Sequence, residues 1–148
     1  MDATVLYDRD CGFCRWSLAK ILAWDRAGRL RPLPIQSEEG RRLLDAAEVP
    51  EEKRLRSWHL VHPDGRVESA GAAFPALFRL LPAGAPVAAL TGALPGLSER
   101  GYMLVANNRT LFGRPLTRGM KDRATARIDE RGPQDVAFST GASCEVRR

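Results

Sequence analysis

The sequence predicts an α/β fold in which a small mixed sheet is flanked by helices, with extra C-terminal helices and a disordered tail. Three observations predict it. Short β-prone segments alternate with helical patterns, a strong turn signal then joins two further strands, and helical spacing dominates up to residue 112. A length of 148 residues suits one domain with a sizeable core. We therefore expect an ordered domain over 1–112 and a basic, mostly disordered tail over 113–148.

The first part of the chain predicts a strand, a helix and a second strand. The stretch 4–7 is short and β-prone, and three polar residues end it. Helical spacing of apolar residues begins at Cys11 and stops near Gly28. The stretch 30–35 is again β-prone, and its two prolines favour an edge position. A strand–helix–strand unit of this kind is expected to be parallel and right-handed.

The middle of the chain predicts a helix and a β-hairpin. Ser37 can cap a helix over 38–47. The turn signal Pro63-Asp64-Gly65 separates the β-prone stretches 57–62 and 66–69, so we expect these to pair as antiparallel strands. This order of elements is the thioredoxin plan, in which a Cys-x-x-Cys pair belongs at the first strand-to-helix junction. The fold is therefore expected to be thioredoxin-like.

Helices are expected after the hairpin. One covers 73–81 and stops at Pro82, a looser one covers 87–94, and the last packed helix covers 97–112. Beyond Gly113 the apolar spacing is lost, and Arg, Gly, Ser and Thr dominate. This change of composition is the reason for the predicted disordered tail.

Composition and charge exclude several classes of protein. About half of the net charge of +5 lies in the tail, but no aromatic residues interleave with its basic residues, so nucleic-acid binding is not expected. The N-terminus lacks the apolar segment of a secretory signal, and no uncharged run is long and unbroken enough to span a membrane. We expect a cytoplasmic protein without a membrane partner, in a compartment that keeps thiols reduced.

Cys11 and Cys14 are the candidate catalytic pair. At a helix start, residues three apart lie on one turn, so their sulfurs can reach disulfide distance with little backbone movement. Cys11 at or near the N-cap would face unpaired backbone N–H groups, which favour the thiolate and lower the pKa of this thiol below about 8.5. We expect Cys11 to attack a substrate disulfide and Cys14, less exposed, to resolve the mixed disulfide.

Three neighbouring residues complete the candidate site. Asp8 can accept the proton of Cys14 in the second step, or it can hold the loop in shape by hydrogen bonds to loop amides. Gly12 lets a substrate backbone approach closely. Phe13 places an apolar ring beside the sulfurs, either for substrate binding or for packing under the loop.

Four segments of the chain carry a resemblance to a known family: Tyr7-Asp8-x-x-Cys11-x-x-Cys14, Leu33-Pro34-Ile35-Gln36-Ser37, Trp58-His59-Leu60-Val61 with the turn and strand that follow, and Val105-Ala106-Asn107-Asn108-Arg109. Through these segments the sequence resembles the DCC family of thiol-disulfide oxidoreductases over about 1–115. The resemblance implies a thioredoxin-like fold with Asp8, Cys11 and Cys14 as motif residues. Unlike thioredoxins, the chain has no proline directly before Trp58.

Two other functions remain open from the residues. The cysteine pair can serve as a redox sensor in a non-enzymatic binding module, or as half of a metal site. Zinc requires four ligands, and the further candidates are His59 and His62, expected on opposite faces of a strand, and Cys144 in the tail. We therefore expect no metal and no cofactor. The expected partner is a disulfide-containing protein or a small-molecule thiol.

Overall fold

A four-stranded open sheet forms the centre of the molecule, in a computed structural model that describes residues 2–132. Its strands follow the order β2-β1-β3-β4, with β1 parallel to β2 and antiparallel to β3, and β3 antiparallel to β4. The strands are β1 (Ala3–Tyr7), β2 (Leu30–Pro34), β3 (His59–Val61) and β4 (Val67–Ser69). The mixed sheet confirms the predicted fold class and is consistent with a thioredoxin-like fold.

Alternation along β1 divides the core between the two faces of the sheet. Ala3, Val5 and Tyr7 point into one cluster of buried residues, and Leu6 points into the other. All four side chains are almost fully buried. The central strand therefore faces protein on both sides, and its C-terminal end brings the chain to the loop before Cys11.

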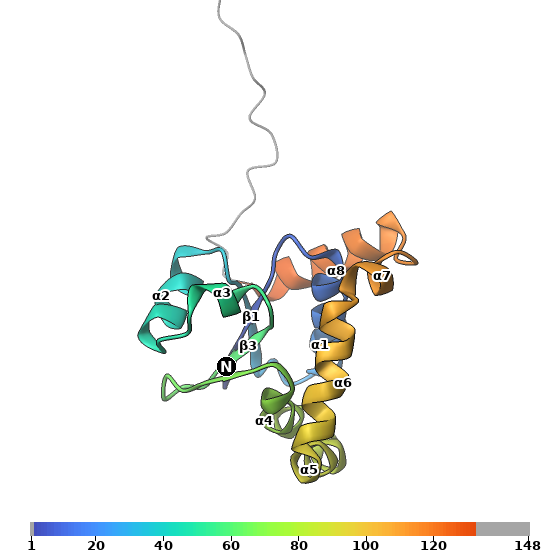
Figure 1. Ribbon diagram of the computed structural model, residues 1–148. Helices are drawn as coiled ribbons and strands as arrows, with labels where there is room; N and C mark the ends of the chain where they lie inside the picture. The colour runs from blue at the N-terminus through green and yellow to red at the C-terminus, as the bar shows by residue number, and fades with distance from the viewer. Residues whose placement is uncertain (1, 133–148) are drawn as a thin grey trace, which may run out of the picture.

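Helices cover both faces of the sheet (Figure 1). α1 (Gly12–Trp24), α4 (Phe74–Leu80) and α8 (Arg118–Arg131) contribute to the cluster beneath Val5, and α2 (Glu38–Ala46) packs on the opposite face. The remaining helices are α3 (Glu51–Arg54), the 3₁₀ helix η1 (Ala70–Ala73), α5 (Ala85–Ala93), α6 (Pro95–Asn107) and α7 (Arg109–Gly113). α6 runs alongside η1 and leads through α7 back to α1.

The helix cap and the two glycine turns predicted from the sequence are present in the structure. The Ser37 hydroxyl accepts the backbone N–H of Gly40 and caps α2. Gly28 ends the turn after α1 with a φ of 67°, and Gly65 occupies the hairpin turn with a φ of 84°. The helix expected over 97–112 is divided at Asn108 into α6 and α7.

The expectation of a disordered tail from residue 113 is wrong for α8. Only two residues of this helix, Ala124 and Ile128, are buried, and their spacing is too sparse for a clear apolar face. Long-range polar contacts help to hold the helix; in one of them, Nη1 of Arg131 donates to Oδ2 of the buried Asp25 at 2.9 Å. Such a long-range ion pair is invisible to local periodicity. Residues 133–148, with Cys144, lie outside the described residues.

No helix within residues 2–132 is both long and apolar enough to cross a membrane.

Candidate active site

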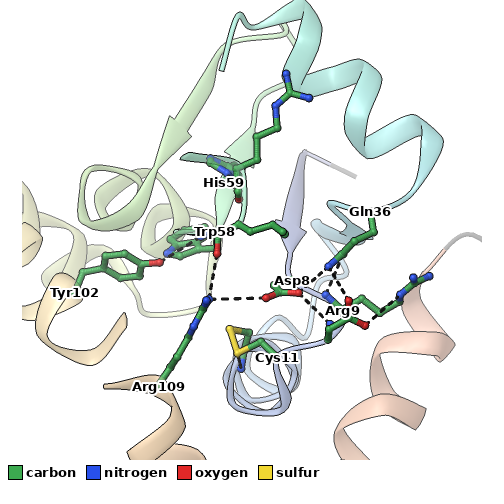
Figure 2. Close-up of polar contacts among 12 residues, drawn as sticks. Asp8, Arg9, Cys11, Gln36, Trp58, His59, Tyr102 and Arg109 are labelled. Atoms are coloured by element: carbon green, nitrogen blue, oxygen red, sulfur yellow. Dashed lines mark hydrogen bonds and ion pairs between the residues drawn. A yellow bond between two sulfur atoms is a disulfide. The ribbon is translucent and has the colours of Figure 1, made fainter. Parts of the chain in front are cut away.

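Cys11 occupies the N-cap of α1, as the sequence predicted. Its sulfur accepts the backbone N–H of Cys14 at 3.2 Å. The two cysteines are joined as a disulfide, and their Cα atoms lie 5.2 Å apart (Figure 2). The extended backbone of Cys11 turns the chain from the loop after β1 into the helix. The attacking sulfur expected from the sequence therefore lies at the positive end of the helix dipole.

The carboxylate of Asp8 is fixed from two sides. Its Oδ1 accepts the side-chain amide of Gln36 at 2.7 Å and the backbone N–H of Asp10 at 3.0 Å. Its Oδ2 lies 3.8 Å from Nη1 of Arg109. Figure 2 shows the Asp8 side chain lying between Gln36 and Arg109, beside the disulfide. Only 15% of this side chain is exposed, so its orientation is set by these partners.

Gln36 and Arg109 were not singled out as site residues from the sequence. Gln36 also accepts the backbone N–H of Arg9 at 3.1 Å, which ties the end of β2 to the loop before Cys11. Arg109 also donates to the carbonyl oxygen of Leu55 at 3.1 Å, which ties α7 to the loop before β3. Both residues lie in segments that carry the family resemblance, and this resemblance was the sequence feature that could have identified them as site residues. Their common partner Asp8 emerges only when the chain is folded.

An apolar cavity of about 320 Å³ lies on the Cys14 side of the disulfide. The residues around it come from β1, α1, the loop before β3, α4 and α6–α7. They include Asp8, Phe13, Cys14, Trp58, Tyr102 and Arg109. The Tyr102 hydroxyl accepts the backbone N–H of Trp58 at 3.3 Å, and burial raises the pKa of Tyr102. The cavity therefore offers an apolar surface, with polar groups near its Asp8 end.

A more open groove of about 500 Å³ lies on the Cys11 side. Asp8, Phe13 and Arg109 line both the groove and the cavity, so they stand between the two. Both cysteines are partly buried. They differ in environment, because Cys14 lines the apolar cavity and Cys11 lines the open groove.

Gly12 and Phe13 line the open groove together with Cys11. A Cβ atom on Gly12 would stand 3.4 Å from Cε of Lys121, so the glycine leaves room under the α8 side chain. The ring of Phe13 packs against Trp16 and Phe112, with ring centroids 6.1 and 6.0 Å apart. Phe13 therefore both packs and forms part of the wall of each cavity.

Two other titratable residues near the sheet, His59 and Tyr7, are buried in the protein core. His59 is buried; its Nε2 donates to the carbonyl oxygen of Arg54, and its Nδ1 accepts the Ser69 hydroxyl. Burial lowers the pKa of His59 and raises the pKa of Tyr7 to about 12. Both groups are therefore neutral near pH 7 and remain uncharged inside the core.

Within residues 2–132, no three His, Cys, Asp or Glu side chains are grouped so that they could hold a metal ion. His62 instead lies 3.3 Å from Glu68, through its Nε2. Both histidines of the chain thus have partners other than the cysteine pair.

The chain matches the family model of the DCC1-like thiol-disulfide oxidoreductases over residues 5–114. No curated protein and no solved structure shows a significant match. The matched region runs from the central strand to the residue after α7, and it contains the disulfide, Asp8, Gln36 and Arg109. It covers well over half of the chain, and so the chain belongs to the DCC1-like thiol-disulfide oxidoreductase family.

Proposed function

We propose that this chain catalyses thiol-disulfide exchange, with Cys11 as the nucleophile and Cys14 as the resolving thiol. The observation that carries the proposal is the position of Cys11 at the helix N-cap, where its sulfur accepts a backbone N–H and lines an open groove. A thiolate at this position is stabilised by the N–H donors and the helix dipole. Membership of the family supports the reaction class.

The reductive reaction has two steps. The Cys11 thiolate attacks one sulfur of a substrate disulfide, forms a mixed disulfide and releases the first substrate thiolate. Cys14 then gives up its proton and attacks the Cys11 sulfur, which releases the second substrate thiolate. The cysteine pair is left as a disulfide and has supplied two electrons. Running the same steps backwards oxidises a substrate dithiol.

We assign the proton transfer of the second step to Asp8. Its carboxylate and Cys14 line the same apolar cavity, and an apolar environment makes an unassisted thiolate costly. Arg109 and Gln36 orient the carboxylate without touching the sulfurs, so we propose them as positioning residues. Gly12 and Phe13 form the substrate-facing wall of the groove. The proposed substrate is a disulfide-containing protein or a small-molecule thiol.

Single cysteine variants test the assignment. The test measures turnover of a peptide disulfide with dithiothreitol as electron donor. In a separate reaction, reduced protein freed of dithiothreitol is mixed with the peptide disulfide and its mass is measured. Cys11→Ser abolishes catalysis, and Cys14→Ser accumulates a mixed disulfide on Cys11. Cys144→Ser is the control for a general thiol effect and keeps full activity. Full activity in both Cys11→Ser and Cys14→Ser disproves the assignment.

A further inference from the structure

The groove beside Cys11 is lined by cations from two helical regions. Arg109 and Arg114 come from α7 and its C-cap, and Lys121 comes from α8. Two carboxylates, Asp8 and Asp10, line the same groove. The net effect of these five side chains depends on which of them already have partners.

Both carboxylates are engaged on the side of the β1 loop. Asp8 is bound by Gln36 and Arg109, and Asp10 lies 3.9 Å from Nε of Arg9. Arg114 and Lys121, in contrast, form no ion pair with any residue in 2–132. These two cations are therefore the unbalanced charge of the groove, and they make it attractive to an anion.

The cations lie where a substrate bound to Cys11 has to lie. In the mixed disulfide the substrate sulfur is attached to Cys11, and Cys11 lines this groove. The Lys121 side chain passes over Gly12, the next residue in the chain, at 3.4 Å from the Cβ position. A group two or three bonds from the substrate sulfur therefore lies in the groove that the two cations line.

Helix α8, which supplies Lys121, lies beyond the part of the chain that matches the family. Side chains at two positions of α8 hydrogen-bond to α1 and its C-cap, and Ile128 packs into the core beside α1. Arg131 binds Asp25, and Nη1 of Arg15 donates to the Thr125 hydroxyl at 3.2 Å. The position of Lys121 is thus set by the fold, because the helix carrying it is anchored at these points against the catalytic helix.

We propose that Arg114 and Lys121 select disulfide substrates that carry an anionic group, such as a carboxylate, two or three bonds from the sulfur. This inference rests on the proposed function, since it takes Cys11 as the sulfur that bonds the substrate. The groove favours the first step of exchange by attracting the substrate charge. The apolar cavity on the Cys14 side does not supply this selectivity, because neither of the two cations lines it.

Three short disulfides of similar size test the proposal: the dianion 3,3′-dithiodipropionate, neutral bis(2-hydroxyethyl) disulfide and the dication cystamine. The protein is Cys14→Ser/Cys144→Ser, so that the reaction stops at the mixed disulfide on Cys11. Rates of mixed-disulfide formation are measured at low salt by quenching and mass spectrometry. Each rate is divided by that of a free cysteine peptide, which removes the intrinsic reactivity of each disulfide.

The expected order is dianion, neutral compound, dication. One cation about 6 Å from a unit charge in water changes the rate about threefold, so two cations favour an anionic group about tenfold over a neutral one and disfavour a cationic group by about the same factor. Arg114→Gln/Lys121→Gln brings the ratio close to that of the free peptide. The matched control Arg123→Gln/Arg127→Gln removes the same charge from exposed positions of α8 and keeps the wild-type ratio.

The outcomes separate the two claims. If none of the three disulfides reacts at Cys11 faster than with the free peptide, the proposed function fails. If all three react but their ratios match the peptide, or if the control variant lowers the ratio as much as Arg114→Gln/Lys121→Gln, the anionic selectivity is overturned and the function stands.

Discussion

Replacing Arg131 by alanine tests how α8 is held on the catalytic helix. The substitution removes the donors to Oδ2 and to the backbone oxygen of Asp25, at 2.9 and 2.8 Å. The Asp25 side chain is 0% exposed, whereas 28% of the Arg131 side chain is exposed. Breaking a buried ion pair costs about 3–5 kcal/mol when one charge is left without a partner.

The expected cost lies below this range. Asp25 keeps the backbone N–H groups of Arg29 and Leu30, at 3.1 and 2.9 Å, and solvent reaches part of Arg131. We expect the free energy of unfolding to fall by about 2–3 kcal/mol, and the melting temperature by roughly 5–10 °C for a chain of this size.

Thermal unfolding followed by circular dichroism measures this effect, with Arg127→Ala as the control. Arg127 is exposed on the same helix and has the same side chain. The control is expected to melt within about 1 °C of the wild type, because exposed substitutions change stability little. Equal melting temperatures for Arg131→Ala and Arg127→Ala contradict the role of the ion pair.

The remaining predictions concern the site and the core. Arg109→Met removes the cation beside Asp8 and slows resolution of the mixed disulfide about tenfold, while formation of the mixed disulfide by Cys11 stays measurable. Single-turnover kinetics separate the two steps, and equal slowing of both steps contradicts the positioning role of Arg109. Burial lowers the pKa of His59 in the folded protein, so as the pH falls the unfolded chain takes up this proton before the folded chain does, and the free energy of unfolding decreases below about pH 6.5. Melting curves from pH 7.5 to 5 measure this decrease, and a His59→Gln variant with the same pH dependence as the wild type refutes it. Burial raises the pKa of both Tyr7 and Tyr102, so absorbance at 295 nm shows little tyrosinate in the folded protein at pH 10; half-titration at this pH is the contrary result.

Local features of the fold could be predicted from the sequence because local interactions determine them. The N-cap position of Cys11 follows from the start of helical spacing directly after a polar turn, and the hairpin follows from Asp64-Gly65 between β-prone stretches. The two faces of β1 follow from alternation of side chains. Each of these signals lies within a few residues of the feature it predicts.

Features that depend on distant partners could not be predicted in this way. Asp8, Gln36 and Arg109 are separated by many residues, and their shared contacts exist only in the folded chain. Helix α8 has little apolar surface and depends on Arg131 reaching Asp25 across more than a hundred residues of sequence. The polar composition of this helix resembles that of a solvated tail, so no local pattern indicates that it docks on α1.

The basic lining of the groove beside Cys11 also depends on the packing of α8 against α1, which the sequence analysis did not predict. Lys121 reaches the first turn of α1 only because α8 packs along it. From the sequence, the basic residues beyond 113 suggested a solvated end. The folded chain places two of them, Arg114 and Lys121, in the groove that Cys11 lines, where charge affects which substrate approaches.

A redox titration of Cys11 and Cys14 tests the central claim most directly. Cys144→Ser protein is equilibrated in graded dithiothreitol buffers, free thiols are alkylated, and the mass at each cysteine is measured. Thiol-disulfide exchange by this pair predicts one two-electron transition in the range of about −180 to −270 mV found for working oxidoreductases. A pair that forms no disulfide in any buffer, or one that stays oxidised far below this range, contradicts the claim.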